Sequence, residues 1–281
     1  MYLRESASRA LTLLAKNPPL FGRTLLAKAN ALRPAPPVPL QCRIGDVVLE
    51  IVSTQKRAAA AMYFRAYSPL VVDAMKRHLR TGDVFIDVGA NVGYLSAVAA
   101  ALVGTRGQVH SFEPVPRYFR SLCRLAELNP SHSIIANTCA VGAVAGSAMI
   151  HITREPGQNT LVAAYKDGAD VISALEVPVI RLDSYIEARR IARVALIKID
   201  AEGFELPILE GMRGCFGRAQ RPAIICEIAP RAYALMGRSV AELANLMSAY
   251  GYTARDIIDG KTPVDLSSLK HVTDVLFLAD V

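Results

Sequence analysis

The sequence predicts an α/β protein built on a mostly parallel sheet covered by helices. Two observations predict this fold. Short apolar runs such as 84–90, 108–114 and 195–203 have the length of buried strands, and segments with helical apolar spacing lie between them. Regular alternation of the two kinds of segment indicates a doubly wound sheet, in which ligands bind beyond the carboxyl ends of the strands.

Each element of this sheet follows from a local pattern. Apolar runs bounded by Gly, Pro or Asp predict the strands, and apolar residues three or four apart predict the helices. The expected strands are 84–90, 108–114, 133–142, 195–203, 222–230, 252–259 and 274–280. The expected helices between them are 93–104, 116–129, 204–212 and 239–251.

The chain is expected to divide into an N-terminal arm and one main domain. Residues 1–39 join a basic, weakly amphipathic helical pattern, broken at "NPP", to the extended linker "RPAPPVP". We expect the arm to pack on the main domain, with a peripheral membrane contact as the alternative. The main domain is expected over 40–281, with a strand and helix cap at about 40–80 and an inserted hairpin at about 147–180 that rejoins the sheet layer.

The composition excludes several classes of protein. The 281 residues are 52% hydrophobic, which is enough to fill a sizeable core. The net charge of +7 is spread along the chain, so it indicates a solvated basic surface rather than a nucleic-acid site. Five Cys and five His lack metal-ligand spacing. With no apolar window that resembles a signal peptide or a membrane span, we expect a reducing, cytoplasmic location and no metal.

The turn after the first expected strand carries the first set of candidate residues. In "VFIDVGANVGYLS", Gly89 and Gly93 let the backbone turn tightly, while Asp87 and Asn91 add side-chain oxygens. The spacing differs from the Gly-x-Gly-x-x-Gly dinucleotide motif and from the Walker loop. An acid in the turn would also repel phosphate. The turn therefore suits a cationic group better than a pyrophosphate.

Glu113 ends the second strand, where an acid in nucleotide-binding sheets accepts hydrogen bonds from both hydroxyls of a ribose. An acidic Gly turn, a ribose-binding acid and no phosphate-binding group together describe a site for a nucleoside with a cationic tail. S-adenosylmethionine has this structure, and we expect it as the cofactor.

Asp200 and Glu202 form a third set, at the end of the buried strand 195–203. In extended geometry these two residues project to the same side, so we expect them to share a pocket. N-capping of the helix at 204–212 is the alternative role for one of them.

These motifs resemble the FkbM-type family of S-adenosylmethionine-dependent methyltransferases. The resemblance covers about 80–281 and depends on the ordered segments "FIDVGANVGYLS", "FEP", "AVG", "RLDSYI", "IKIDAEGFE" and "CEI". It implies the class I, Rossmann-like methyltransferase fold: a seven-stranded, mostly parallel sheet with helices on both faces. The last strand, here 274–280, would run antiparallel between the fifth and sixth.

The resemblance also implies a role for each site residue. The turn at 87–93 would hold the methionine part of the cofactor, Glu113 the ribose, and the segment 137–141, which ends at Val141, the adenine. Asp200 and Glu202 would lie where cofactor and acceptor meet and would act in catalysis. Many family members carry an Asp where this chain has Ala143.

Four functions remain open at this point. The first is O-methylation of a hydroxyl on a sugar, glycan, glycolipid or secondary metabolite, and it is the one that the resemblance favours. The second is N-methylation of an amine or peptide. The others are a basic nucleic-acid-binding protein, which 6% aromatic residues and no Trp disfavour, and a membrane-associated protein without catalysis.

Overall fold

The computed structural model describes most of the chain. The described residues are 10–31, 39–52, 56–155, 157–165, 170–217 and 219–280.

The main sheet has seven strands in the order β11-β12-β10-β9-β3-β4-β5. Its strands are β3 (Val84–Val88), β4 (Gln108–Phe112), β5 (Ser133–Asn137), β9 (Leu196–Ile199), β10 (Ala223–Ile228), β11 (Tyr252–Asp256) and β12 (Thr273–Ala279). Neighbouring strands from β5 to β10 are parallel, and β12 is antiparallel to β10 and β11. The expected fold is confirmed, including the antiparallel last strand between the fifth and sixth.

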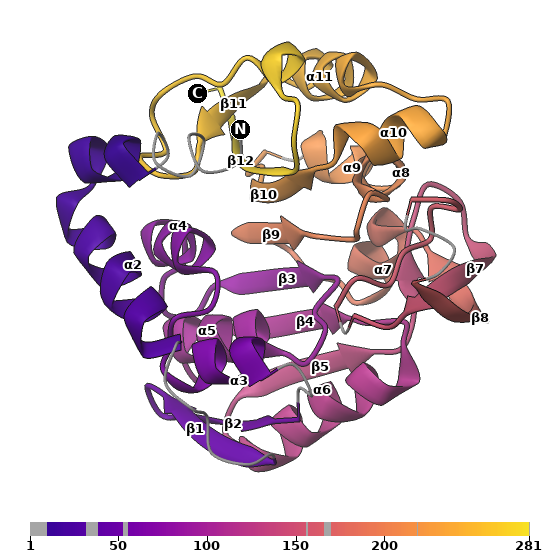
Figure 1. Cartoon of the computed structure of the whole chain (residues 1–281). Helices are drawn as coiled ribbons and strands as arrows, with labels where there is room; N and C mark the ends of the chain where they lie inside the picture. The colour runs from indigo at the N-terminus through magenta and orange to yellow at the C-terminus, as the bar shows by residue number, and fades with distance from the viewer. Residues whose placement is uncertain are drawn as a thin grey trace.

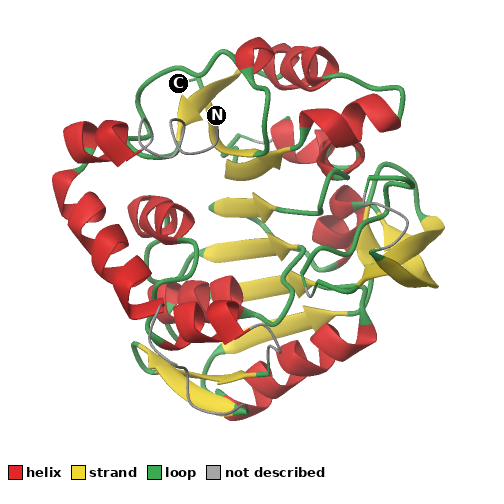
Figure 2. Cartoon of the chain, viewed as in Figure 1, coloured by secondary structure: helices red, strands yellow, loops and turns green. Residues whose placement is uncertain are grey.

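Helices cover both faces of this sheet (Figure 2). One face carries α3 (Lys56–Tyr63), α4 (Pro69–His78), α5 (Tyr94–Val103) and α6 (Pro116–Leu128). The other carries α7 (Leu182–Ala188), α8 (Glu205–Glu210), α9 (Arg213–Phe216), α10 (Pro230–Leu235) and α11 (Val240–Ala249). Adjacent strand residues alternate between the two cores: Phe85 packs in the first and Ile86 in the second. Burial on both faces explains why these strands are continuous apolar runs.

The insert forms a second sheet of three strands, in the order β6-β8-β7. Its strands are β6 (Ala140–Val141), β7 (Gly146–Thr153) and β8 (Val171–Ile180). Figure 1 shows β7 and β8 beyond the carboxyl ends of the main strands. The expectation that the insert rejoins the main sheet is wrong, because its pairing partner is the two-residue strand β6. The expected strand 133–142 is correspondingly split after Asn137, and the chain becomes helical at Leu182.

A two-stranded hairpin packs against α5 and α6, which cover the first face of the sheet. It consists of β1 (Leu40–Ile44) and β2 (Val47–Ile51), which pair antiparallel. Its inward side chains, including Val47 and Leu49, are fully buried. The strand expected in the cap at about 40–80 is therefore present as part of a hairpin.

The N-terminal arm packs on the main domain, as expected. Residues 10–16 are helical, and α2 (Pro18–Ala31) begins directly after the expected break. Leu13 and Leu20 are buried in the first core. Of the expected linker, residues 33–38 lie outside the described residues.

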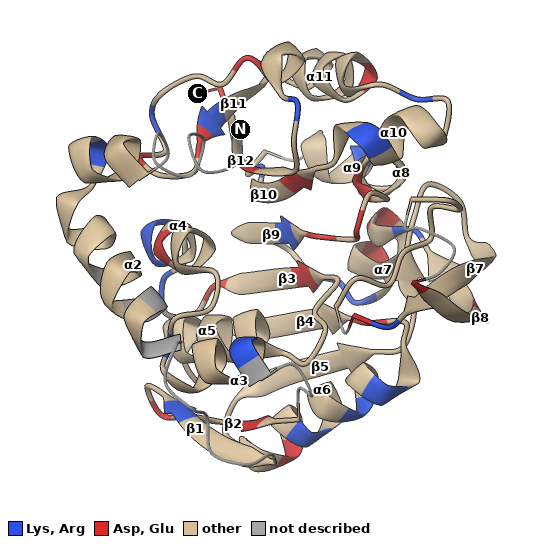
Figure 3. Ribbon diagram, viewed as in Figure 1, with Lys and Arg blue, Asp and Glu red and all other residues tan. Residues whose placement is uncertain are grey.

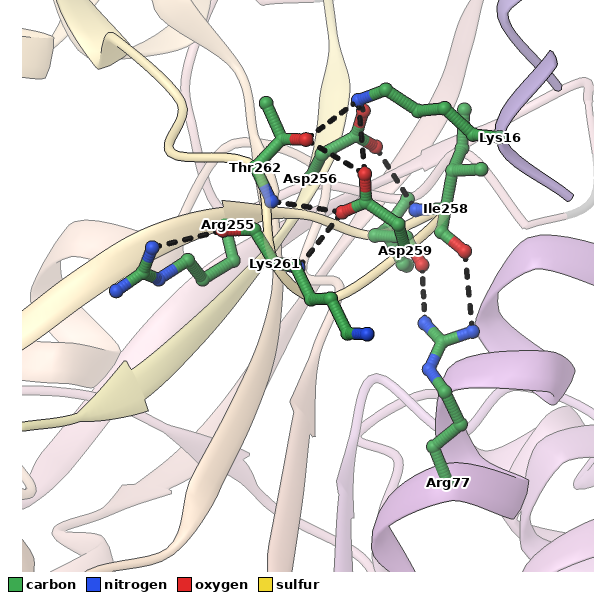
Figure 4. A network of polar contacts seen from close by, with 9 residues as sticks. Lys16, Arg77, Arg255, Asp256, Ile258, Asp259, Lys261 and Thr262 are labelled. Atoms are coloured by element: carbon green, nitrogen blue, oxygen red, sulfur yellow. Dashed lines mark hydrogen bonds and ion pairs between the residues drawn. The ribbon is translucent and has the colours of Figure 1, made fainter. Parts of the chain in front are cut away.

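An ion-pair network fixes the arm to the last part of the chain (Figure 4). The Lys16 ammonium lies 2.6 Å from Asp256 and 3.1 Å from Asp259. Close by, Arg77 of α4 donates to the backbone carbonyls of Ile257 and Ile258. The loop after β11 therefore holds both the arm and α4.

Candidate functional site

A cavity of about 270 Å³ opens at the carboxyl ends of β3, β4, β9 and β10. Figure 3 shows acidic residues at the ends of β3, β9 and β10 and a basic residue within β9. The residues expected at the site that line this cavity are Gly89, Asn91, Glu113, Val141, Asp200 and Glu202. Two more, Asp87 and Gly93, lie close by but do not line it. The sheet thus brings together residues up to 113 positions apart along the sequence.

Gly89 is required because the Gly turn touches the end of β9. Its φ angle is +78°, and a Cβ there would lie 1.8 Å from the carbonyl oxygen of Asp200. Any larger residue would push the two strand ends apart. Gly93 has a different role: at its φ of +86° a Cβ would lie 2.8 Å from the Leu122 side chain, so it permits α5 to start close against α6.

Glu113 is a buried carboxylate that faces the cavity. Its Oε2 accepts from the backbone N–H of Asn91 at 2.9 Å, and its Oε1 accepts from that of Val115 at 2.9 Å. Burial raises the pKa of Glu113 to about 7, although the two N–H groups act in the opposite direction. Each oxygen keeps a second lone pair, so the group can still accept from two hydroxyls.

Asp87 lies behind the cavity wall. Its side chain is fully buried, and its Oδ2 accepts from the Ser96 hydroxyl at 2.6 Å. Its Oδ1 makes no hydrogen bond and lies 3.9 Å from the Lys198 ammonium. Burial raises the pKa of Asp87, and the nearby Lys198 opposes that rise. Asp87 therefore does not line the cavity in this structure, and its contact with the cofactor stays a prediction.

Lys198 is a site residue to which the sequence assigned no role. Its ammonium lies 3.1 Å from Asp200 Oδ2 and donates to the Gly89 carbonyl at 3.4 Å. Burial alone would lower its pKa, but the Asp200 and Asp87 carboxylates raise it above the usual value, so the group stays charged. The sequence does contain a sign of this role, because a lysine inside the otherwise apolar strand "ALIKI" must find a buried partner.

Asp200 and Glu202 share the cavity, but not through extended geometry. β9 ends at Ile199, and Glu202 adopts a left-handed φ of 50°. The Thr160 hydroxyl donates to the Glu202 carbonyl at 2.7 Å, which ties this loop to the insert. The two residues line one cavity, as expected. The expected reason was wrong, because a turn and not an extended strand directs their side chains.

Glu205 organises the loop between β9 and α8 by accepting hydrogen bonds from its backbone. Its Oε1 accepts from the N–H groups of Ala201 at 3.1 Å and Gly203 at 2.8 Å. Burial raises the pKa of Glu205 to about 7. The first residue before α8 is Phe204, which makes no side-chain cap. Neither Asp200 nor Glu202 is therefore the N-cap of α8, and the capping alternative is wrong.

Two further acids extend the cavity toward β12. Glu227 of β10 and Asp274 of β12 are paired across the sheet and both line the cavity. Burial raises the pKa of Glu227, with further contributions from Asp200 and Glu202. This side of the cavity therefore gathers four acidic side chains close to one another, those of Asp200, Glu202, Glu227 and Asp274.

The insert and a pair of tyrosines complete the walls. Gly157, Asn159 and Leu161 line the cavity from the insert. Tyr67 and Tyr94 line the opposite side, with ring centroids 5.3 Å apart in an edge-on arrangement.

His110 is buried and bonded to Tyr185 and Gln108, as expected of a core histidine, and burial lowers its pKa to about 4. Within the described ranges, no group of three or more His, Cys, Asp or Glu residues could hold a metal ion. In that same part of the chain, no helix has the length and apolar character needed to cross a bilayer.

The strand order and the cavity are those of class I S-adenosylmethionine-dependent methyltransferases. Residues 87–254, more than half of the chain, match the model of the methyltransferase FkbM domain. The chain therefore belongs to the FkbM methyltransferase family.

Curated relatives resemble part of this chain. "Hexuronic acid methyltransferase AglP" of Haloferax volcanii is 25% identical over 50% of this chain and 55% of its own length. "31-O-demethyl-FK506 methyltransferase FkbM" of Streptomyces tacrolimicus is 30% identical over 48% of this chain and 61% of its own length. The chain thus matches just over half the length of these relatives. Among solved structures, precorrin-6y C5,15-methyltransferase of Geobacter metallireducens aligns with a TM-score of 0.42 and 11% identity, over 84% of this chain and 95% of that one.

Proposed function

We propose that this protein transfers the methyl group of S-adenosylmethionine to a hydroxyl oxygen of a sugar, glycan, glycolipid or secondary metabolite. The observation that carries the proposal is a single cavity with Glu113 on the β4 side and Asp200, Glu202 and Glu227 on the side of β9 and β10. The side with Glu113 suits the ribose of the cofactor. The side with Asp200, Glu202 and Glu227 suits its cationic sulfonium and the acceptor that faces it.

The cofactor half is assembled from the Gly turn and β6. Glu113 would accept from the ribose hydroxyls, and the backbone at Gly89 and Asn91 would hold the methionine part. Val141, buried at the cavity wall, would contact adenine. Asp87 would act indirectly, by keeping Lys198 and α5 in place behind the turn.

The electrostatics favour a cationic cofactor. Four carboxyl groups line the acceptor side of the cavity, and Lys198 is the cation that lines it with them. A bound sulfonium and ammonium would reduce the repulsion among these acids. The same acids would disfavour a phosphate at this position.

Methyl transfer is an in-line displacement in which the acceptor oxygen forms a bond to the methyl carbon as the carbon–sulfur bond breaks. The sulfur leaves with the electron pair, and the hydroxyl proton must pass to a base. Asp200 is anchored by Lys198 at 3.1 Å, which suits it to orient the reactants. We assign proton acceptance to Glu202. Alignment of the reactants supplies most of the acceleration.

The names of the relatives support an oxygen acceptor. One is named for a hexuronic acid and another for a 31-O-demethyl compound. N-methylation of an amine would use the same cofactor half and remains the second enzymatic candidate, because an acidic acceptor side also suits an amine.

Turnover of a panel of acceptors with methyl-labelled S-adenosylmethionine tests the proposal. Matched hydroxyl and amine acceptors, such as glucose, glucuronate, glucosamine and a short peptide, would be compared under one condition. Labelled product from hydroxyl compounds alone is expected. Labelled product from amines alone would refute O-methylation, and failure to bind the cofactor in calorimetry would refute the whole assignment.

The arm supports a proposal about location. Leu11, Leu25 and Leu26 are 67%, 59% and 62% exposed, on helices whose Leu13 and Leu20 face the domain. We propose a cytoplasmic protein with no nucleic-acid partner, whose arm contacts a membrane surface peripherally. Flotation with anionic liposomes should be lost in a Leu11→Ser/Leu25→Ser/Leu26→Ser variant, and unchanged flotation would refute the contact.

A further inference from the structure

A second cavity of about 320 Å³ lies beside the first, at the ends of β10 and β12. Pro230 and Arg231 reach it two and three residues after β10 ends at Ile228. Lys270, His271 and Val272 reach it directly before β12 begins at Thr273. Both cavities therefore lie at one edge of the sheet.

The two cavities are close enough for one small molecule to span them. Glu227 and Asp274 face each other in register and line the first cavity, while Val272 and Arg231 line the second. Asp274, which lines the first cavity, and Val272, which lines the second, are two residues apart in the sequence, which corresponds to at most about 7 Å of extended chain. A monosaccharide with a charged substituent, or a disaccharide, can span this distance.

Tyr165 lies near residues of both cavities. It lines the second cavity, and its ring lies 3.6 Å from the position that a Cβ on Gly203, next to Glu202, would occupy. Burial raises the pKa of Tyr165 to about 12, with Glu202 and Glu227 adding to the rise and Arg231 opposing it. Tyr165 thus lies within electrostatic reach of both the acidic and the basic groups.

The charges of the two cavities are opposite. The acceptor side of the first carries Glu202, Glu227 and Asp274. Of the described residues, the second carries Arg231, Lys270 and His271 together with the acid Asp170. An anion is repelled by the first set and attracted by the second. An acidic molecule that enters both cavities can therefore bind in only one orientation.

We propose that the second cavity binds an anionic group of the methyl acceptor, a carboxylate or a phosphate, while the hydroxyl to be methylated lies at Glu202. This inference deepens the proposed function and rests on it. It narrows the acceptor from any hydroxyl compound to an acidic one. Arg231 and Lys270 are specificity-determining residues in this arrangement, because they contact the acceptor away from the reacting atoms.

Titration with inorganic phosphate and with acetate, followed by backbone amide NMR, tests the cavity without knowledge of the acceptor. Saturable shifts are expected at the amides of Arg231, Lys270 and Val272. The response to acetate relative to phosphate shows which of the two anions the site prefers. In Arg231→Ala/Lys270→Ala the affinity should fall at least about tenfold, the effect of losing one charged hydrogen bond. The control Lys261→Ala removes an exposed cation elsewhere and should leave the response unchanged.

Competition links the anion site to the acceptor. Glucuronate should displace phosphate, and glucose, which has the same ring and hydroxyls without the carboxylate, should not. Absence of a saturable response, an unchanged response in the double variant, displacement by neither sugar or equal displacement by both would each overturn the inference. Calorimetry of S-adenosylmethionine on the same samples separates the two proposals, because cofactor binding without an anion response rejects only the second cavity.

Discussion

The ion pair that Lys198 makes behind the cavity gives the sharpest test of how the site is held together. Lys198 is almost fully buried, and it neutralises Asp87, which is fully buried, and Asp200, whose side chain is 36% exposed. The variant Lys198→Met keeps the length of the side chain and removes the charge. Removing one partner of a buried pair costs about 3–5 kcal/mol of unfolding free energy, and we expect a loss in this range.

The cost should come mainly from Asp87, although it is the more distant carboxylate. Solvent can screen Asp200 once the lysine is gone, whereas Asp87 has only the Ser96 hydroxyl as a hydrogen-bond donor. Lys198→Met/Asp87→Asn should therefore recover most of the lost stability. Lys198→Met/Asp200→Asn is the matched control and should recover little.

The effect should also depend on pH. Burial holds the pKa of Asp87 above its ordinary value, and Lys198 opposes that rise, so the pKa should rise further in Lys198→Met. A group with a raised folded-state pKa binds more protons when folded, and its contribution to stability is lost as pH rises. Lys198→Met should therefore be less destabilised at pH 5 than at pH 8.

Urea unfolding followed by circular dichroism measures these differences, since the chain has no tryptophan for fluorescence. The linear slope should match between variants, so that shifts in midpoint report stability. A loss below about 1 kcal/mol in Lys198→Met, the value typical of an exposed pair, would refute the reasoning. Equal recovery by the two double variants would refute the assignment to Asp87.

Three further predictions concern the cavity itself. Glu113→Gln should weaken S-adenosylmethionine binding about 10- to 100-fold in calorimetry, the value of a charged hydrogen bond; because the pKa of Glu113 is raised to about 7, wild-type affinity should increase from pH 6 to pH 8 and that of the variant should not. Glu202→Gln should lower kcat at least about 100-fold, as expected for loss of a general base, with cofactor affinity retained; an unchanged kcat would reject it as the base. Gly89→Ala should destabilise the fold by more than about 3 kcal/mol through its clash with the Asp200 carbonyl. Gly82→Ala is the control, because Gly82 has a similar φ of +91° with nothing within 4 Å, and it should cost only about 1–2 kcal/mol; equal losses would contradict the clash.

The main sheet was predictable because its strands are buried on both faces. Apolar runs of strand length, such as the one ending at Val88, have no alternative place to pack. Gly or Pro follows within two residues of the ends of α5, α6 and α8. The antiparallel last strand came from the family resemblance and not from periodicity. The insert was less predictable: β8 (Val171–Ile180) is rich in apolar residues but largely exposed, with Ile172 and Leu175 among the exposed ones. Its apolar residues therefore do not mark the face that packs against a partner.

Six of the eight predicted site residues line the cavity, and their roles stay predictions. Strand ends converge in any parallel sheet, so Glu113 and Asp200 had to lie at one edge. Their partners depend on tertiary contacts: a sequence cannot show that Lys198 lies 3.9 Å from Asp87 and 3.1 Å from Asp200. The left-handed conformation of Glu202 was equally hidden, because non-glycine residues rarely adopt it.

The contact between Gly89 and the Asp200 carbonyl has a kinetic consequence. The turn proposed to receive the cofactor and the loop proposed to receive the acceptor touch through their backbones, with no side chain between Gly89 and the Asp200 carbonyl to absorb a displacement. A shift of the turn when S-adenosylmethionine enters would therefore be transmitted to the loop that carries Glu202. We expect ordered binding, in which the cofactor enters first and completes the acceptor site.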